Sequence, residues 1–317
     1  MGSRTRSPAG ERGRGARVEG GGLEQPRRHR TRTAILDSVA VVAENSRDLV
    51  DPWSEELLST SGYERTGFAA GFDSNRPAPP PVLLDILCLA AQVDGPRLVV
   101  DLGSGTGLST RPWADRAEQV IGVEASPEMR AQAEAATGAD NVRFVQAYAQ
   151  ATGLPDGEAD LVTCSQALHW MKPEPTFAEA ARLLRPGGVF AAYDYDWPPV
   201  VNWEVEAAFE ELLQRVRAGR APDGRGMRYA KDGHLERIEA SGHFRYAREV
   251  VFHARDRADA ARIVGMALSL GPLTVRLHEG LSEEEAGLTA LREAANRALG
   301  DHETEIFIGY RIRLGVK

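Results

Sequence analysis

Five short apolar runs, separated by longer segments with a helical pattern, constrain the fold of this chain more than any other feature. A continuous apolar run is typical of a strand buried on both faces, and alternation with helices is typical of a parallel sheet. Two later runs are rich in β-branched and aromatic residues, so they would complete the sheet as an antiparallel edge pair. The sequence therefore predicts an α/β fold, with a seven-stranded, mostly parallel sheet and helices on both faces. The predicted strands are 97–102, 119–124, 142–146, 160–165, 188–194, 244–254 and 305–314.

The chain of 317 residues begins with a segment that differs from the rest. Residues 1–33 carry nine arginines, three glutamates and few apolar residues, so burial cannot offset the entropy of ordering them. We therefore expect a disordered basic leader over 1–33. Residues 34–81 predict a helical cap or lid that ends in a proline-rich stretch. Residues 82–317 predict the main domain, with an inserted cap around 195–240.

Amphipathic patterns predict individual helices within this main domain. Two of them are expected at 82–93 and 203–217. A third begins at Ser282, where Ser-Glu-Glu-Glu is typical of a capping box, and is expected to run to about residue 299.

Charge and cysteine content exclude several classes of protein. Residues 34–317 carry 29 Lys and Arg against 43 Asp and Glu, a net charge of −14, which disfavours nucleic acid as a partner. No apolar run approaches the roughly 20 residues of a membrane span, and the N-terminus lacks the apolar core of a signal peptide. Two cysteines, Cys88 and Cys164, are too few for a disulfide framework or a cysteine-based zinc site. We therefore expect a cytoplasmic protein; 35 arginines against three lysines favour a bacterial source with a GC-rich genome.

A glycine-rich loop follows the first predicted strand. Asp101-Leu102 leads into Gly103-Ser104-Gly105-Thr106-Gly107, and glycine there permits positive φ and close approach of a ligand to the backbone. The spacing is G-x-G-x-G, whereas dinucleotide-binding folds typically carry G-x-G-x-x-G. Glu124 ends the second strand, where an acid can accept both hydroxyls of a ribose. Ligands of open α/β sheets bind beyond the carboxyl ends of the strands, so these residues are expected to line one crevice.

Four segments together resemble the class I S-adenosylmethionine-dependent methyltransferases, which are Rossmann-like enzymes. They are 99–107, 122–129, 154–162 and 183–188. The resemblance covers residues 82–194 and extends to the C-terminal third only by architecture. Within this family, Ser165–Trp170 and Arg76-Pro77 are most similar to the trans-aconitate methyltransferase-like branch. The resemblance implies in-line methyl transfer from S-adenosylmethionine to an O, N or C nucleophile of a small molecule, with S-adenosylhomocysteine as product. The GC-rich bacterial source favours specialised metabolism as the setting.

The resemblance also implies a set of cofactor contacts. The glycine loop would hold the methionine part, Asp101 would lie near its amino group, and Glu124 would hold the ribose. Many relatives have an aspartate where this chain has Tyr148, so Tyr148 or Gln150 would replace it against adenine. The implied cofactor-binding residues are Asp101, Gly103, Ser104, Gly105, Gly107, Glu124, Ala125, Met129, Tyr148, Ala149, Ser165 and Gln166.

The acceptor side is less defined by sequence. His169 follows the fourth strand and is the best candidate for a general base; the alternative is that it packs in the pocket wall. Arg76 would bind an anionic acceptor or form a structural salt bridge. No acidic cluster of the kind that holds Mg²⁺ follows the strands, so we expect no metal. The candidate substrate-binding residues are Tyr63, Phe72, Arg76, Trp170, Tyr193, Tyr195 and Trp197.

Two other functions remain open from the sequence alone. A nicotinamide-dependent oxidoreductase would require the G-x-G-x-x-G spacing, which this loop lacks. A non-catalytic S-adenosylmethionine-binding regulatory or scaffold protein would keep the fold without the reaction. The expected partner is a small-molecule acceptor, with neither nucleic acid nor membrane, and the chain would be a monomer or homodimer.

Overall fold

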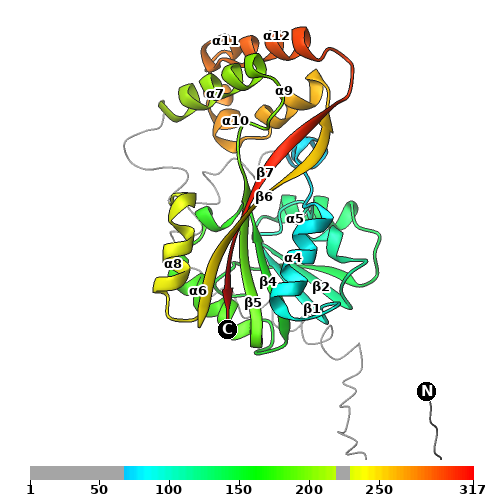
Figure 1. The fold of residues 1–317 in the computed structure, drawn as a ribbon, viewed down its shortest axis with the longest axis vertical. Helices are drawn as coiled ribbons and strands as arrows, with labels where there is room; N and C mark the ends of the chain where they lie inside the picture. Colours follow the sequence, from blue (N-terminus) through cyan, green and yellow to red (C-terminus); the bar gives the residue numbers. More distant parts are fainter. Residues whose placement is uncertain (1–67, 219–228) are drawn as a thin grey trace, which may run out of the picture.

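The computed structural model describes residues 68–218 and 229–317, and it places all seven predicted strands in one sheet (Figure 1). Their order across the sheet is β3-β2-β1-β4-β5-β7-β6. The first five strands are parallel, whereas β7 runs antiparallel to both β5 and β6. The predicted fold is therefore confirmed. The strands are β1 (Leu98–Leu102), β2 (Gln119–Glu124), β3 (Val142–Gln146), β4 (Ala159–Ser165), β5 (Leu184–Tyr195), β6 (Tyr246–Ala258) and β7 (Thr304–Val316).

Helices cover both faces of this sheet because its central strands are apolar on both sides. On one face, Leu83 and Leu87 of α4 (Pro81–Ala91) pack in the same core as Val99 of β1. On the other face, Phe177 of α6 (Pro173–Leu183) shares a core with Val100 of β1. Neighbouring residues of a strand point to opposite faces, so β1 is buried from end to end. A further helix, α5 (Pro127–Ala135), connects β2 to β3.

A group of helices lies beyond the carboxyl ends of the parallel strands, at the top of Figure 1. We call it the helical cap. Leu212 of α7 and Leu291 of α12 are fully buried in the same apolar core within it. The members of the cap are α7 (Trp203–Ala218), α9 (Ala260–Leu268), α10 (Gly271–His278), α11 (Glu283–Ala286) and α12 (Leu288–Ala298).

The composition of this cap differs from the prediction of an insertion around 195–240. Only α7 comes from that segment, and four of the cap helices lie between β6 and β7. The helix α8 (His234–Ala240) lies along the side of the sheet near α6, away from the cap (Figure 1), and its Ile238 is fully buried against β7. Sequence periodicity identifies an apolar helix face without identifying the surface that it covers, which explains the difference.

The helix predicted from Ser282 to about 299 is two helices. The capping box at Ser282 is present, since its hydroxyl accepts from Glu285 N–H and the Glu285 carboxylate accepts from Ser282 N–H. Gly287 then takes a φ of +84°, which ends α11 before α12 begins. A Cβ at Gly287 would lie 3.4 Å from the Leu212 backbone. The break therefore lets α7 approach closely.

The N-terminal expectations are covered only in part. Residues 1–67, including the predicted leader and Tyr63, lie outside the described residues. The described part of the predicted lid is α3 (Phe68–Asn75) and the proline-rich stretch before α4. Within the described ranges, no single helix is long and apolar enough to span a membrane; the pair α9 and α10, bent by 77°, meets that test only when joined.

Buried His234 predicts a pH dependence of stability. Its burial, aided by Arg237, Arg313 and Lys231, lowers its pKa to about 4 from the ordinary 6.5. Between these values the unfolded chain binds the additional proton, so stability is lost as the pH falls from about 6.5 to about 4. The free energy of unfolding of His234→Gln should fall less over this interval, by about 3 kcal/mol. Urea unfolding at pH 7 and pH 4.5 measures this difference, with the exposed His302→Gln as the control. Equal losses of unfolding free energy in wild type, His234→Gln and His302→Gln would contradict the prediction.

Candidate functional site

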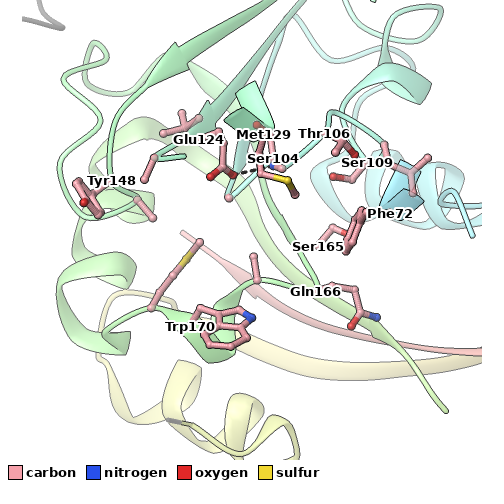
Figure 2. A pocket seen from close by; sticks show the side chains of 18 of the residues that line it. Phe72, Ser104, Thr106, Ser109, Glu124, Met129, Tyr148, Ser165, Gln166 and Trp170 are labelled. Carbon is pink, nitrogen blue, oxygen red and sulfur yellow. Dashed lines mark hydrogen bonds between the residues drawn. The ribbon is translucent and has the colours of Figure 1, made fainter. Parts of the chain in front are cut away.

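A cavity lies where β1, β2, β3 and β4 end, and residues from all four strand ends line it (Figure 2). The helix α3 and the proline-rich stretch after it contribute to its wall. Parallel strands bring their carboxyl ends to one edge, which explains why segments far apart in sequence meet here. The predicted site residues that line it are Phe72, Gly103, Ser104, Gly105, Glu124, Ala125, Met129, Tyr148, Ala149, Ser165, Gln166, Trp170 and Tyr195.

The glycine loop lies on this cavity in a conformation that requires glycine. Gly103 and Gly105 have φ of +67° and +58°, values that side chains rarely tolerate. The N–H groups of Gly103 and Ser104 donate to the Val123 carbonyl at 2.8 and 3.1 Å, which ties the loop to β2. A Cβ on Gly103 would lie 2.7 Å from the Cβ of Ala167, so the loop also packs against the segment after β4.

Glu124 is the acidic residue of the cavity, and its carboxylate binds the glycine loop. Its Oε2 accepts from the Gly105 N–H and its Oε1 from the Ser126 N–H, both at 2.8 Å. Burial raises the pKa of Glu124, and these hydrogen bonds act in the opposite direction. The Ala125 N–H is a third backbone donor to this carboxylate. Since a carboxylate has about four acceptor sites, it can still accept a hydroxyl group of a ligand while it positions the loop.

Ser104 is a second polar residue of the cavity wall. Its Oγ is buried and has no hydrogen-bond partner among the residues that the structure describes. This Oγ lies against β2, where a Cβ on Gly122 would be 2.8 Å from it, so Ser104 contributes to the cavity wall while its hydroxyl is covered. The glycine cradle and the Glu124 carboxylate together fit the polar parts of S-adenosylmethionine.

Asp101 and Gly107 do not line the cavity, and their predicted cofactor contacts stay predictions. Asp101 is fully buried, and its carboxylate accepts from the hydroxyls of Ser109, Thr110 and Thr163 at 2.7 to 2.8 Å. Burial raises its pKa, and these hydrogen bonds oppose the rise. A Cβ on Gly107 would lie 2.9 Å from Phe144. Both residues therefore shape the loop from behind.

The wall expected at adenine comes from the chain after β3. Tyr148 and Ala149 line the cavity there with Gln150, and Tyr148 pairs with Ala151 in an isolated antiparallel bridge. Figure 2 shows Tyr148 and Met129 among the side chains around the cavity. The α5 helix begins after Ser126, whose Oγ accepts from the Met129 N–H at 3.3 Å.

The opposite end is lined by aromatic rings and by Gln166. Phe72, Trp170 and Tyr195 line the cavity there. Gln166 has a φ of +53°, uncommon for a residue with a side chain. Its Oε1 accepts from Lys231 Nζ, which also pairs with Asp194 at 2.7 Å. Since an ammonium only donates, this contact fixes which end of the amide is oxygen.

Arg76 lies behind this aromatic wall and does not line the cavity. It is 7% exposed and donates to Ser269 Oγ, Ser269 O and Tyr195 Oη at 2.7 to 2.8 Å. Within the described ranges no carboxylate forms an ion pair with it. The structure therefore places Arg76 as a connection between α3 and the helical cap. Its predicted contact with an anionic acceptor stays a prediction.

Three further candidates are also absent from the cavity wall. His169 is buried in a short helical turn, Leu168–Trp170. Tyr193 is 2% exposed, and burial raises the pKa of its hydroxyl. Trp197 stacks on Phe209 of α7 with ring centroids 5.5 Å apart. The sequence places these residues at the strand ends without showing their depth, and their predicted contacts with substrate stay predictions.

Sequence reasoning missed several lining residues, most of which are small, apolar or hydroxylic: Pro77, Pro79, Thr106, Leu108, Ser109, Val123, Ala147, Ala167 and Met171. They lie beside predicted residues, so adjacency to the glycine loop and to the strand ends is the signal that could have found them.

In the described part of the chain, no group of three or more His, Cys, Asp or Glu side chains could hold a metal ion.

The position of His169 leads to a testable expectation. Because His169 is buried and outside the cavity wall, we expect His169→Ala to lower the melting temperature and to leave affinity for S-adenosylhomocysteine unchanged within about two-fold. Calorimetric titration and thermal unfolding measure the two effects. Unchanged stability together with lost turnover would restore the general-base role for this histidine.

Comparison with known proteins identifies the domain family of one segment of the chain. The sequence family described as "Methyltransferase domain" matches residues 100–192, the segment that contains the glycine loop and Glu124. Residues 100–192 are thus a methyltransferase domain. An uncharacterized methyltransferase of Mycobacterium tuberculosis is 37% identical over 123 residues, which cover 38% of this chain and 48% of that protein. A Dictyostelium discoideum protein named as a methyltransferase is 35% identical over 105 residues, covering 33% and 39% respectively.

These curated relatives show similarity over part of their length. This chain spans about half the length, or less, of the curated relatives that it matches. A solved structure of a proposed type II methyltransferase from Anaeromyxobacter dehalogenans covers 76% of this chain and 97% of its own, with a TM-score of 0.59 and 23% identity. That likeness extends the shared fold beyond the segment with sequence similarity.

Proposed function

We propose that this methyltransferase-domain protein transfers a methyl group from S-adenosylmethionine to a small-molecule acceptor. The observation that carries the proposal is the cavity in which the Glu124 carboxylate and the glycine loop meet. The methyltransferase domain family and the fold of the solved structure support it. When bound, this cofactor supplies a methyl group on a positively charged sulfur, which is already activated toward a nucleophile.

The chain's own residues would bind and orient the cofactor. Glu124 would accept the ribose hydroxyls, and the loop 103–105 would hold the methionine part against its backbone. The backbone at Ala149 and the side chain of Tyr148 would contact adenine. This arrangement would direct the methyl group toward Ser165 and Gln166 at the end of β4.

The acceptor end indicates the kind of nucleophile that this site suits. Phe72, Trp170 and Tyr195 would exclude water and contact an apolar or aromatic acceptor of modest size. Among the described residues of the cavity wall there is no histidine, lysine, arginine or aspartate. Alignment would therefore contribute most of the rate, and the site suits an acceptor that needs no strong base, such as a carboxylate or an ionised phenol. Specialised metabolism is the setting that we propose for such a reaction.

Titration calorimetry with S-adenosylmethionine and S-adenosylhomocysteine tests this proposal, with NAD as control. We expect micromolar affinity for the first two ligands and no heat with NAD. Absence of binding by both would overturn the proposal. Acceptors would then be screened by mass spectrometry for one added methyl group; tight cofactor binding with no methylated product from any carboxylate, phenol or amine pool would favour a non-catalytic binding protein.

A further inference from the structure

The helix α3 contacts the outer side of the glycine loop through one carboxylate. Asp73 Oδ1 accepts from the Thr106 hydroxyl at 2.9 Å and from Arg111 Nη2 at 2.7 Å. Arg111 Nη1 in turn donates to the Thr106 carbonyl at 2.6 Å. We call these three residues the Asp73 clasp. The Asp73 and Arg111 side chains are 20% and 23% exposed, so solvent screens this pair less than a surface pair.

The clasp acts on the part of the loop that most needs support. Thr106 lies between Gly105 and Gly107, both with positive φ. Glycine loses more conformational freedom on ordering than other residues, so a loop with alternate glycines samples other conformations unless it is anchored. Glu124 anchors Gly105 from the cavity side, whereas the clasp anchors Thr106 from the outside.

The other end of α3 is held independently of the loop. Arg76 donates to Ser269, which follows α9 of the helical cap. Gly265 of α9 faces Asn75, and a Cβ there would lie 2.0 Å from the Asn75 side chain. Loss of the clasp therefore releases the loop while these contacts keep α3 and its Phe72 at the cavity wall.

We propose that Asp73 is a positioning residue that holds the glycine loop in its cofactor-binding conformation and slows release of the cofactor. The proposal rests on the proposed function, because it concerns the same cofactor site. Neither Asp73 nor Arg111 lines the cavity, so both residues act through Thr106. This assigns to α3 a part in cofactor binding that the glycine motif alone does not contain.

The expected change in cofactor affinity follows from the fraction of molecules whose glycine loop is in the binding conformation. If loss of the clasp lowers the fraction of competent loop to about one tenth, the apparent dissociation constant rises about ten-fold. We expect this for Asp73→Ala, which removes both acceptor contacts at a helical position that alanine favours. Asp73→Asn keeps an acceptor oxygen and loses the charge, so its affinity should lie between alanine and wild type.

The experiment measures binding and dissociation of S-adenosylhomocysteine by calorimetry and stopped-flow competition. The variants are Asp73→Ala, Asp73→Asn, Arg111→Met and the double variant Asp73→Ala with Arg111→Met. We expect about ten-fold weaker binding and faster release for each alanine or methionine variant, with no further loss in the double variant. Asp85→Asn is the control: Asp85 lies on α4 and forms a surface ion pair with Arg116. This variant should bind S-adenosylhomocysteine as wild type does.

The outcomes separate this inference from the function on which it rests. A wild-type protein that binds no S-adenosylhomocysteine would overturn the proposed function and this inference with it. A wild type that binds, alongside Asp73→Ala and Arg111→Met with affinity and release within two-fold of it, would overturn the inference alone. Melting curves without ligand identify a variant that fails to fold. In that case Asp73→Asn, with the same expected direction, decides the question.

Discussion

Gly105→Val should abolish measurable binding of S-adenosylmethionine and S-adenosylhomocysteine, a loss of at least about 100-fold. Gly105 has a φ of +58°, which a β-branched residue strongly disfavours. A Cβ at this position would meet only the Met129 Cε, at 3.5 Å. The added methyl groups would therefore occupy the cavity itself, and the folded protein would lose the space that the cofactor needs.

Calorimetry on Gly105→Val measures this, and Gly157→Val is a matched control. Gly157 also has a positive φ, +68°, and a Cβ there would meet nothing within 4 Å. It lies in the turn before β4, outside the cavity wall. The control carries the same backbone strain without filling the site, so it should bind both ligands normally. Normal binding by Gly105→Val would remove the glycine loop from the cofactor site.

Glu124→Ala should weaken cofactor binding by about 1–3 kcal/mol, or roughly 5- to 150-fold, through lost hydrogen bonds to a charged group. The structure adds a second cost, because the Gly105 and Ser126 N–H groups would lose their acceptor. Glu124→Gln is a sharper test. Both carboxylate oxygens accept backbone N–H groups, so an amide NH₂ in place of either would place two donors together.

We therefore expect Glu124→Gln to bind no better than Glu124→Ala, although it keeps the shape of the side chain. Burial raises the pKa of Glu124, so wild-type affinity should begin to fall with acidification at a higher pH than an ordinary glutamate would give. Titrations from pH 8 to pH 5 measure this shift. Wild-type affinity in Glu124→Gln would show that the carboxylate has no part in binding.

The strands and the cofactor loop could be predicted because their signals are local. A buried parallel strand is a continuous apolar run, and the end of each run locates one part of the crevice. Glu124 and Gly105 follow directly from that reasoning and line the cavity. The predicted cofactor contacts of these residues await the binding experiments.

Depth and long-range partners could not be predicted in the same way. Asp101 and Tyr193 lie near the same strand ends and are buried beneath the cavity. Arg76 donates to Ser269, 193 residues later in the chain, and no local pattern indicates such a pairing. The composition of the helical cap could not be predicted for the same reason, because the sequence shows apolar helix faces and does not show the surfaces against which they pack.

The hairpin of β6 and β7 has a consequence for how this chain can vary. The two strands pair without interruption from Tyr246 with Val316 to Ala258 with Thr304. The four helices between them leave and rejoin the sheet at that last pair. Insertions or deletions among these helices can leave the strand register intact, whereas one residue added within either strand would turn its side chains to the opposite face. The helical cap above the cavity can thus change between two fixed points while the cofactor crevice, which none of these four helices lines, keeps its geometry.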